Sequence, residues 1–513
     1  MDEVKIKTAL ISVYHKDGLE PVVKKLYESG VQIISTGGTA SFIKSLNVLV
    51  TEVEELTHFP EILGGRVKTL HPKIFGGILG RRELSDDVHQ MHEHMIPQID
   101  LVIVDLYPFE TTVASTTDEF TIIEKIDIGG IALIRAAAKN FNDVLVCPSR
   151  EEYENLFMLL EEKSGITSKE DRQLFAAKAF AVSSSYDTLI FNYFNRAGKI
   201  TTFKKSINHF KNLRYGENPH QKGIFYGETD LLYEQLNGKE LSYNNLADID
   251  AAFDLIDEFK VPACAIIKHT NACGVAEAED VVEAWNKALA ADPVSAFGGI
   301  IIFNQRIIEA LAGKINGIFF EIIIASGYDE GALQILRQKK NRIILLRKEV
   351  TKNQGNETGN KVFKSLLNGI IEQSRDELLS SEETLKIVTQ NHPSKNQVTD
   401  LLFAEKCVKH LKSNAIAIVK GKQLIGMGCG QTSRIDALKQ AIARAKAFHL
   451  DLKDSVLASD AFFPFNDWVE LAHAEGINAI LQPGGSIRDQ DSINLCNEYQ
   501  MPMVFTGLRH FRH

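Results

Sequence analysis

Short apolar runs alternate with amphipathic segments over the first 150 residues. The runs at residues 9–13, 31–35, 101–106 and 144–147 are continuously apolar, which is typical of strands buried on both faces. Segments 20–29 and 40–46 have the spacing of helices. Strands that are each followed by a helix predict a doubly wound parallel α/β sheet. Residues 151–193 then have a helical pattern, and the polar stretch 195–205 predicts a boundary.

A second series of strands is expected after Leu213, at residues 263–267, 299–303, 322–325 and 342–346. Residues 351–361 have too little apolar surface for a strand or helix and predict a loop. Beyond them we expect, in order, a hairpin at 414–419 and 423–427, a helix at 434–448, strands near Val456 and Ile480, a helix near Ser492 and a strand at 503–505. The pattern therefore predicts three successive α/β layers.

Length, charge and cysteine content exclude several classes of protein. The chain has 513 residues, which is too long for one hydrophobic core. It carries 57 Lys and Arg against 67 Asp and Glu, a net charge of -10, which disfavours a bulk nucleic-acid binder. Six scattered cysteines form no C-x-x-C pair, and no apolar run reaches the length of a membrane span. We expect a cytoplasmic protein without membrane contact.

Two segments of the first half are candidate anion sites. The sequence Ser35-Thr36-Gly37-Gly38-Thr39 lies between a strand and a helix, where free helix amides suit a phosphate. The alternative is a plain turn with Thr39 as N-cap. In Gly64-Gly65-Arg66-Val67-Lys68-Thr69-Leu70-His71-Pro72, Arg66 and Lys68 would project to one side of an extended segment and converge on one anion. A solvated basic turn is the alternative.

Other side chains could handle protons. Tyr107 follows a buried strand, at the edge where open parallel sheets bind ligands. Asp127 precedes a helix on which Arg135 and Lys139 share a face, so Asp127 is an acid or a helix cap, and Lys139 a reactive or dipole-compensating cation. His89, His92 and His94 lack the carboxylate pattern that would complete a metal site.

The second half is denser in candidate chemistry. Residues 213–221, LRYGENPHQ, concentrate ligand-capable side chains on a turn. Lys268 and His269 follow an apolar strand and can serve one centre only if regular structure ends there, with His269 then kept neutral as a base. Residues 459–465, SDAFFPF, offer aromatic surface for a planar heterocycle or for a core. The zinc-deaminase signature does not occur.

Together these segments resemble the bifunctional purine-biosynthesis family that joins AICAR formyltransferase to IMP cyclohydrolase. The likeness spans nearly the whole chain and includes GGRVKTLHP, LYPF, IDIGG, RAAAKN, LRYGENPHQ, IKH, GQTSR and SDAFFPF in the expected order. It implies a methylglyoxal synthase-like cyclohydrolase domain at 1–199 and a transformylase at 200–513, built from two cytidine-deaminase-like α/β units divided at about residue 360. It also implies a homodimer without zinc.

The resemblance implies two reactions, the last two of purine (IMP) biosynthesis: formyl transfer from 10-formyltetrahydrofolate to AICAR, then dehydrative closure of formyl-AICAR to IMP. It makes His269 the base, Lys268 an electrostatic support and Asn414 the residue that orients the formyl oxygen. For ring closure it implies Lys68, Tyr107, Asp127 and Lys139. Substrate contacts would come from Ser12, Lys16, Ser35, Thr36, Gly37, Gly38, Arg66, Thr69, Arg214, Tyr215, Gly298 and Arg509. Contacts with the reduced folate would come from Arg434, Phe462, Pro464, Phe465 and Asp467.

Three positions depart from the family pattern, and two rival functions stay open. Ala272, Ile131 and Ser326 stand where relatives usually have proline, so they affect loop stiffness and leave the reacting side chains in place. One rival is a nucleotide-sensing first domain, which would need residues 35–39 and Arg66 but not the proposed catalytic set. The other is a nicotinamide oxidoreductase, although no G-x-G-x-x-G turn with its acidic partner occurs.

Overall fold

The computed structural model describes residues 2–349 and 361–513, and the chain divides into two compact units, Met1–Asn208 and His209–His513. The functional boundary expected at residue 199 remains a prediction. Across the two described stretches, no helix combines the length and apolar character that crossing a membrane requires.

The first unit is a five-stranded sheet with the order β4-β3-β2-β5-β6, and all of its pairings are parallel. Its strands are β2 (Thr8–Val13), β3 (Gln32–Ser35), β4 (Thr51–Glu52), β5 (Leu101–Asp105) and β6 (Leu145–Cys147). The short strands β1 (Glu3–Lys5) and β7 (Ile166–Ser168) pair separately and antiparallel. The predicted doubly wound parallel sheet is confirmed.

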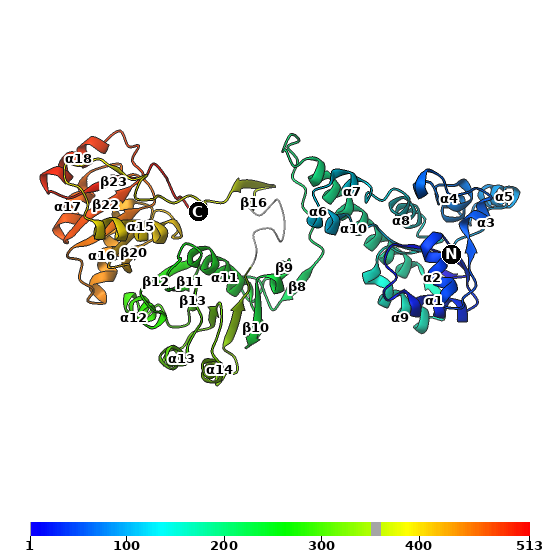
Figure 1. The fold of residues 1–513 in the computed structure, drawn as a ribbon, viewed down its shortest axis with the longest axis horizontal. Helices are drawn as coiled ribbons and strands as arrows, with labels where there is room; N and C mark the ends of the chain where they lie inside the picture. The colour runs from blue at the N-terminus through cyan, green and yellow to red at the C-terminus, as the bar shows by residue number, and fades with distance from the viewer. Residues whose placement is uncertain (1, 350–360) are drawn as a thin grey trace. The chain divides into compact units, whose positions relative to one another are not determined.

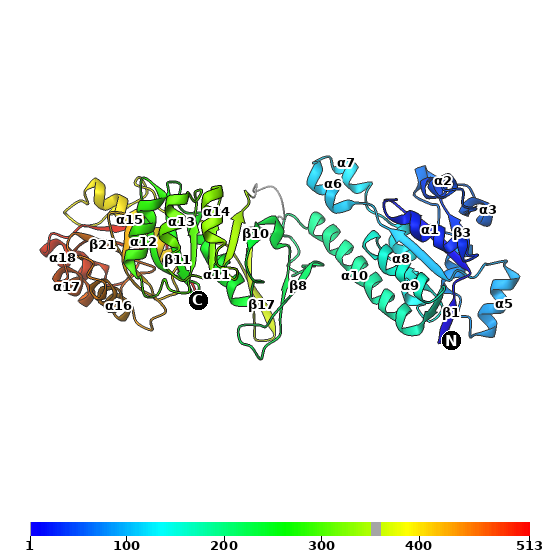
Figure 2. The same ribbon diagram turned by 90° about the horizontal axis from the view of Figure 1, so that it is seen from below.

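Alternation along the central strand explains why both faces are covered. Ala9 and Ile11 of β2 belong to one apolar cluster and Leu10 belongs to the other, because successive side chains of a strand point to opposite faces. Helices α1, α2 and α9 pack on the first face, and α4, α8 and α10 pack on the second (Figures 1 and 2). The helices of this unit are α1 (Leu19–Glu28), α2 (Gly37–Ser45), α3 (Val53–Thr57), α4 (Pro72–Leu79), α5 (Ser85–Glu93), α6 (Phe109–Ser115), α7 (Glu119–Ile123), α8 (Gly129–Lys139), α9 (Tyr153–Glu162) and α10 (Lys169–Phe194).

The second unit contains one twelve-stranded sheet, with the order β10-β15-β14-β13-β11-β12-β20-β19-β21-β22-β23-β18. The two α/β units expected after the first domain are its two halves, and the structure joins them into one continuous sheet. The two halves of this sheet join where Ala276 of β12 pairs with Gln423 of β20, a long-range pairing that local sequence patterns do not reveal. The strands are β10 (Tyr233–Asn237), β11 (Ala263–Lys268), β12 (Asn271–Glu277), β13 (Ile300–Phe303), β14 (Ile322–Ala325), β15 (Ile343–Arg347), β18 (Lys386–Ile387), β19 (Ile416–Lys420), β20 (Gln423–Gly428), β21 (Ser455–Ser459), β22 (Ile477–Gln482) and β23 (Met503–Phe505).

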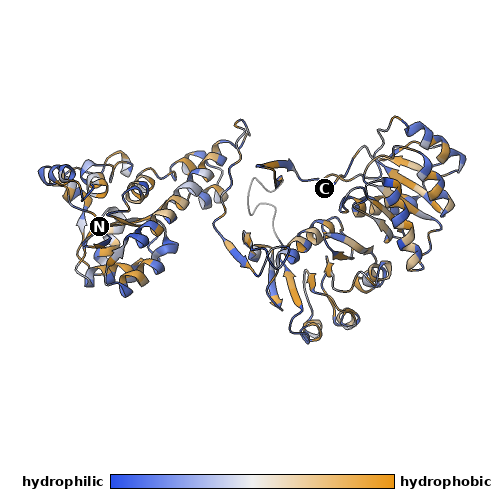
Figure 3. Ribbon diagram, turned by 180° about the vertical axis from the view of Figure 1, so that it is seen from behind, coloured by the Kyte–Doolittle hydropathy of each residue, from blue (hydrophilic) through white to orange (hydrophobic). Residues whose placement is uncertain are grey.

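Helices cover both faces of this sheet as well. Helices α11 and α15 share one apolar cluster with strands from both halves of the sheet. On the other face, α12, α13 and α14 cover the first half, and α16, α17 and α18 cover the second. Apolar strands lie between more polar helix surfaces (Figure 3). The helices are α11 (Tyr243–Ile256), α12 (Val281–Ala291), α13 (Glu309–Ile315), α14 (Glu330–Leu336), α15 (Lys395–Lys409), α16 (Arg434–Ala447), α17 (Asp467–Ala474) and α18 (Asp489–Glu498).

The strands expected from residue 263 onward are all present, including the β19–β20 hairpin. Two hairpins outside the sheet were not expected: β8 (Phe210–Leu213) with β9 (Gly223–Tyr226), and β16 (Lys361–Leu366) with β17 (Gly369–Ser374). The loop expected at 351–361 lies outside the described residues up to 360, and Lys361 begins β16.

Candidate active sites

The first candidate site lies where β2, β3 and β5 end. These strands run parallel, with Ile11 opposite Ser35 and Val13 opposite Asp105, so their carboxyl ends meet at one edge. Ligands of open α/β sheets bind at this edge. Ser12, Ser35 and Thr36 therefore come together there. The Lys16 ammonium donates to the carbonyls of Val13 at 3.1 Å and Tyr14 at 2.7 Å, and burial lowers the pKa of Lys16.

The loop after β3 begins its helix earlier than expected. Helix α2 starts at Gly37 with Thr36 as N-cap, so the prediction of Thr39 as N-cap is wrong. The Thr39 hydroxyl instead donates to the Val13 carbonyl at 2.9 Å and accepts from its amide at 3.2 Å, which ties the helix to β2. Gly37 has φ +43°, and the Thr36 carbonyl accepts from Thr39 and Ala40. The amides of Gly37 and Gly38 thus precede the first intrahelical bonds.

Lys68 lies over the start of α2. A Cβ added to Gly37 would lie 2.8 Å from the Lys68 ammonium, and the same ammonium forms an ion pair with Glu61. Arg66 pairs with a different carboxylate, Glu124. The prediction that this segment is extended is wrong at Arg66, whose φ of −67° and ψ of −23° are helical. The reason is the 3-10 turn Leu63–Gly65, which ends just before Arg66. The two cations consequently have separate partners.

Asp127 is both a helix cap and a buried acid. One carboxylate oxygen accepts from the Gly130 amide at 2.7 Å, and the other accepts from the Tyr107 amide at 3.4 Å. Burial raises the pKa of Asp127 against these two hydrogen bonds. Thr69 also reaches this point, since a Cβ on Gly129 would lie 3.3 Å from its hydroxyl oxygen. Thr69, Tyr107 and Asp127 therefore meet at the start of α8.

Lys139 lies at the opposite end of α8. The helix spans Gly129–Lys139, which corresponds to about 15 Å of rise. Lys139 and Arg135 share a face, as predicted, and line a hollow of about 340 Å³ together with Phe75, Leu79, Ala136 and Phe180. Within one chain, α8 does not bring Lys139 to Asp127.

Sequence reasoning missed several side chains of this edge. Asp105 accepts from both the His15 amide at 2.9 Å and the His15 ring at 2.7 Å. Tyr186 on α10 accepts from the Asp127 amide and donates to the Lys125 carbonyl, both at 2.8 Å, and burial raises its pKa to about 12. Local motifs did not reveal the link from Tyr186 to Asp127, because 59 residues separate them.

The second candidate site begins at a turn after β11. Regular structure ends at Lys268, as the sequence required for Lys268 and His269 to serve one centre. His269 and Thr270 have φ angles of 53° and 61°, which turn the chain into β12. The Lys268 ammonium donates to the Phe297 carbonyl at 2.7 Å, beside Gly298. His269 is exposed and Lys268 is half-buried.

Asn414 lies in a buried polar network. Arg434 donates to the Asn414 side-chain oxygen and to Asp460, both at 2.8 Å. The other oxygen of Asp460 accepts from Ser413 at 2.5 Å. Arg434 also donates to the Phe462 carbonyl at 2.9 Å. Asp460 is fully buried, so this network fixes Asn414 from two sides.

One hydrogen bond connects these two parts of the second unit. The Lys412 amide donates to the Asn271 side-chain oxygen at 3.1 Å, and the Asn271 amide group donates to the His269 carbonyl at 2.9 Å. The turn that carries Lys268 and His269 thus lies beside the segment leading to Asn414. The C-terminal residues run along the same segment, because Arg512 and Ser413 exchange two hydrogen bonds.

The remaining predicted residues lie on three other segments of the second unit. Arg214 donates to the Tyr215 hydroxyl at 2.9 Å and lies over its ring. Arg509 precedes His510, whose amide donates to the Asp460 carbonyl. Phe462, Pro464, Phe465 and Asp467 are exposed, and they follow the end of β21. The Arg488 guanidinium lies 5.1 Å from the Phe465 ring centre.

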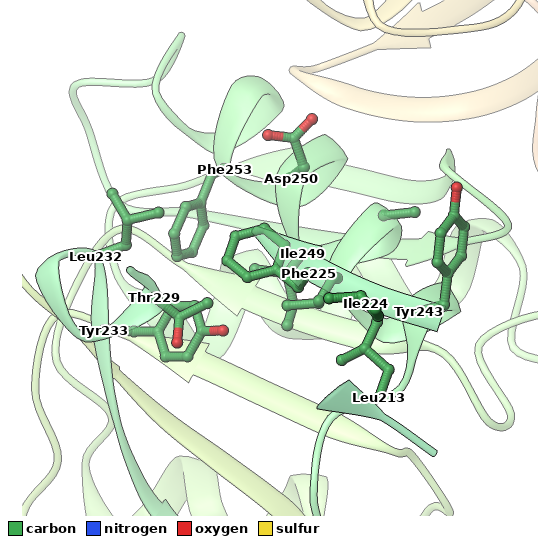
Figure 4. Close-up of a pocket in the computed structure, with 12 residues that line it drawn as sticks. Leu213, Ile224, Phe225, Thr229, Leu232, Tyr233, Tyr243, Ile249, Asp250 and Phe253 are labelled. Carbon is green, nitrogen blue, oxygen red and sulfur yellow. The ribbon is translucent and has the colours of Figure 1, made fainter. Parts of the chain in front are cut away.

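A separate hollow of about 370 Å³ lies between α11 and the β8–β9 hairpin (Figure 4). Its walls are mainly apolar or aromatic, and its only charged side chain is Asp250. Because a phosphate needs cations or free amides, this hollow does not suit a nucleotide. None of the predicted catalytic residues lines it.

Two further features of the sequence analysis can be compared with the structure: metal-ligand clusters, and the three residues that stand where relatives usually have proline. The described parts of the chain contain no group of three or more His, Cys, Asp or Glu side chains suited to hold a metal ion. Ala272 pairs with Ile267 in the β11–β12 ladder, Ile131 lies inside α8, and Ser326 follows β14. Ala272 and Ile131 therefore lie in regular elements.

Comparison with known proteins gives matches along the chain. Residues 18–132 match a family described as "MGS-like domain", and residues 137–444 match one described as "AICARFT/IMPCHase bienzyme". A Bacteroides thetaiotaomicron protein described as "Bifunctional purine biosynthesis protein PurH" is 58% identical over 509 residues, covering 99% of each chain. Proteins with the same description from Caldicellulosiruptor bescii and Aquifex aeolicus are 46% identical, covering 99% and 98% of this chain and 100% of theirs. A solved chain titled "Crystal structure of ForH" is 34% identical and covers 37% of this chain and 98% of its own, with a TM-score of 0.33.

Proposed function

The chain belongs to the AICARFT/IMPCHase bienzyme family, and from this premise we propose how its residues carry out the two reactions. The protein is a bifunctional enzyme of the last two steps of purine biosynthesis, an AICAR formyltransferase and an IMP cyclohydrolase. The assignment of residues to steps rests chiefly on one observation. The hydrogen bond from Lys412 to Asn271 holds the Lys268–His269 turn beside the segment that carries Asn414.

Formyl transfer is assigned to the second unit. The amine of AICAR attacks the formyl carbon and loses a proton to His269, while the bond from that carbon to the donor nitrogen breaks and the nitrogen takes up a proton. Lys268 supplies positive charge near the developing oxygen charge, and Asn414 orients the formyl oxygen. Loss of one such donor costs about 3 kcal/mol of transition-state stabilisation. Arg214, Tyr215, Gly298 and Arg509 are proposed to contact the nucleotide.

The proposed formyl donor is 10-formyltetrahydrofolate. Exposed rings of Phe462 and Phe465 offer flat apolar surface for a pterin, with Pro464 and Asp467 nearby. Arg434 is assigned here through its hydrogen bonds to the Phe462 carbonyl and to Asn414. These contacts support Arg434 as the link between the folate surface and the residue that orients the formyl oxygen.

Ring closure is assigned to the first unit. The carboxamide nitrogen attacks the formyl carbon and water leaves, so both reacting groups lie on one molecule and proximity comes from the substrate. Asp127, whose pKa is raised by burial, is proposed to hold and deliver a proton. Lys68 and Tyr107 stabilise the oxygen charge. The phosphate is assigned to the start of α2, with Ser12, Lys16, Ser35, Thr36, Gly37, Gly38, Arg66 and Thr69 around it.

Lys139 is proposed to act on ring closure in an assembly of two chains. The length of α8 separates it from Asp127 within one chain, so a second protomer is needed to bring both to one substrate. A homodimer is proposed on this ground, and the exposed apolar side chains of Leu367, Ile370 and Ile371 support it. A cytoplasmic location and functional domains at 1–199 and 200–513 complete the proposal.

The decisive experiment separates the two activities in the full-length protein. We expect His269→Ala to lower formyl transfer by about 10²–10⁴-fold, the usual contribution of a positioned base, while ring closure of supplied formyl-AICAR is unchanged. Lys68→Met should do the reverse. Both rates are followed by absorbance, and equal loss of both activities in either variant would contradict the assignment.

A further inference from the structure

The turn that carries His269 has an unusual backbone. His269 and Thr270 are adjacent, neither is a glycine, and both have positive φ angles, 53° and 61°. L-residues rarely adopt this conformation, and it persists only where surrounding groups hold it. The groups that hold this turn consequently determine where the exposed His269 ring points.

Asp248 on α11 holds the turn from one side. Its carboxylate accepts from the Thr270 amide at 2.7 Å across 22 residues of sequence. Burial raises the pKa of Asp248, and the Thr270 amide, the charge of His269 and the His269 amide each act in the opposite direction. The carboxylate therefore lies on the amide side of the turn.

Two donors hold the same peptide from the other side. The Thr270 hydroxyl donates to the His269 carbonyl at 2.7 Å, and the Asn271 side chain donates to it at 2.9 Å. The amide side of the turn is thus held by Asp248, and the carbonyl side by Thr270 and Asn271. Since Asn271 also accepts from Lys412, the turn has a fixed place relative to the Asn414 segment.

Helix α11 is a rigid support for Asp248. Ser242 and Asn245 form a capping box at its start, and Ile249 and Ala252 are buried in the sheet cluster. The carboxylate of Glu321, just before β14, also raises the pKa of Asp248. Glu321 accepts from Asn245 at 2.9 Å and pairs with Lys239 at 3.3 Å, so its charge is largely satisfied.

We propose that Asp248 is a positioning residue for formyl transfer, whose carboxylate fixes the His269 turn so that the imidazole faces the amine of AICAR. The proposal rests on the proposed role of His269 as the base. Asp248 contacts the turn and not the reacting atoms, so it acts through His269.

The test compares Asp248→Ala with Asp248→Asn in the full-length protein. The alanine variant removes the acceptor, and we expect its kcat for formyl transfer to fall by up to about a hundredfold, the effect of small misplacement, with little change in KM for AICAR. The asparagine variant keeps an oxygen that accepts from Thr270, so its kcat should recover to within about tenfold of the wild type. Ring closure of supplied formyl-AICAR should be unchanged in both.

Rescue by the conservative variant separates positioning from a merely structural role. A residue needed only for folding would lower the free energy of unfolding and both activities together, whereas loss of the acceptor that positions the turn should lower kcat for formyl transfer alone. Asp257→Asn is the matched control, since Asp257 is an exposed carboxylate just after the end of α11, paired with Arg347. Its rate of formyl transfer should match the wild type.

The outcomes distinguish this proposal from the proposed function. Wild-type kcat in Asp248→Ala, or equal impairment of the alanine and asparagine variants, overturns the positioning role while His269→Ala still reports on the base. If His269→Ala itself keeps full formyl transfer, the proposed function fails first. If Asp248→Ala does not fold, Asp248→Glu takes its place, because the longer side chain moves the carboxylate away from the Thr270 amide: a lower kcat for formyl transfer with unchanged ring closure supports the proposal, and a wild-type kcat overturns it.

Discussion

The two candidate sites hold their charged groups in opposite ways. In the first unit, Lys68 and Arg66 project from a surface loop, and the side chains of their carboxylate partners Glu61 and Glu124 are each more than one-third exposed, at 39% and 35%. In the second unit, Arg434 and Asp460 have side chains only 8% and 0% exposed. The charged side chains of the first site are exposed enough to change partners, and we call this site adjustable. Those of the second are held by buried hydrogen bonds, and we call this site fixed.

This difference fits the demands of the two reactions. Ring closure joins two groups of one molecule, so the site needs charge near a phosphate and a leaving oxygen more than it needs exact direction. Formyl transfer joins two molecules, and an oxygen whose charge develops must meet a donor that already points at it. Buried networks supply such direction, and exposed ion pairs do not.

The largest expected effect comes from breaking the buried network. Asp460→Ala removes the carboxylate that faces Arg434 and Ser413. Breaking a buried pair typically costs about 3–5 kcal/mol because one charge is left uncompensated. We expect a loss of that order in the free energy of unfolding of the second unit, measured in urea, together with loss of formyl transfer.

The matched change in the first unit is Glu124→Ala, which leaves Arg66 without its carboxylate on the surface. Exposed pairs contribute about 0.2–1 kcal/mol, so the urea midpoint should hardly move. Similar losses in the two variants would remove the contrast between an adjustable and a fixed site.

A second prediction concerns pH and the C-terminal segment. The buried His510 ring contacts Asp376 at 2.7 Å and Glu405 at 3.5 Å, and despite burial these carboxylates raise the pKa of His510 to about 9. Since the folded value lies above the unfolded value of about 6.5, this stabilisation is complete below pH 6.5 and is lost as pH rises toward 9. The expected loss is on the order of 3 kcal/mol.

Urea unfolding between pH 6 and 10 measures this effect, with His510→Gln as the comparison. The variant should lack the fall in stability between pH 6.5 and 9. The neighbouring His410 acts in another range, because burial lowers its pKa and its contribution is lost only as pH falls below 6.5. A wild-type profile that is flat from pH 6.5 to 9 would exclude the role given to His510.

The sequence was sufficient for the parts of this comparison that depend on local pattern. Continuous apolar runs predicted the parallel strands of the first unit, because burial on both faces leaves a clear signal. The apolar run that ends at Ile267 predicted a strand end there, and β11 ends one residue later, at Lys268. The β19–β20 hairpin followed from two apolar runs close together.

Contacts between distant segments were not predictable. The pairing of Ala276 with Gln423 merges two expected layers into one sheet, and nothing near either residue signals it. The bonds from Thr270 to Asp248 and from Ser413 to Asp460 join segments that are individually unremarkable. Thr39 was misread because a threonine before a helical pattern resembles a cap, whereas its hydroxyl bonds to β2.

A third prediction tests how closely Lys68 approaches α2. Gly37→Ala places a Cβ 2.8 Å from the Lys68 ammonium at a residue with φ +43°. The backbone cost is about 1–2 kcal/mol, and the ammonium must move, so we expect lower stability and a higher KM for formyl-AICAR. Gly30→Ala is the control, since Gly30 also has a positive φ, +72°, and its added Cβ meets nothing within 4 Å. Equal effects of the two variants would contradict the close approach.

The smallest expected effect tests whether the charges of the first site are adjustable. Glu61 pairs with Lys68, so an incoming anion competes with this carboxylate for the ammonium. In Glu61→Gln the competition weakens, and because exposed pairs contribute about 0.2–1 kcal/mol, KM for formyl-AICAR should fall by about 1.5- to 5-fold.

Added salt screens the carboxylate and should shrink the difference in KM between variant and wild type. Glu161→Gln, which removes the exposed carboxylate partner of Lys25 near the other end of α1, should leave KM unchanged. A higher KM in Glu61→Gln would mean that the carboxylate positions Lys68 for the substrate, and the first site would then resemble the second in holding its cation by a fixed partner.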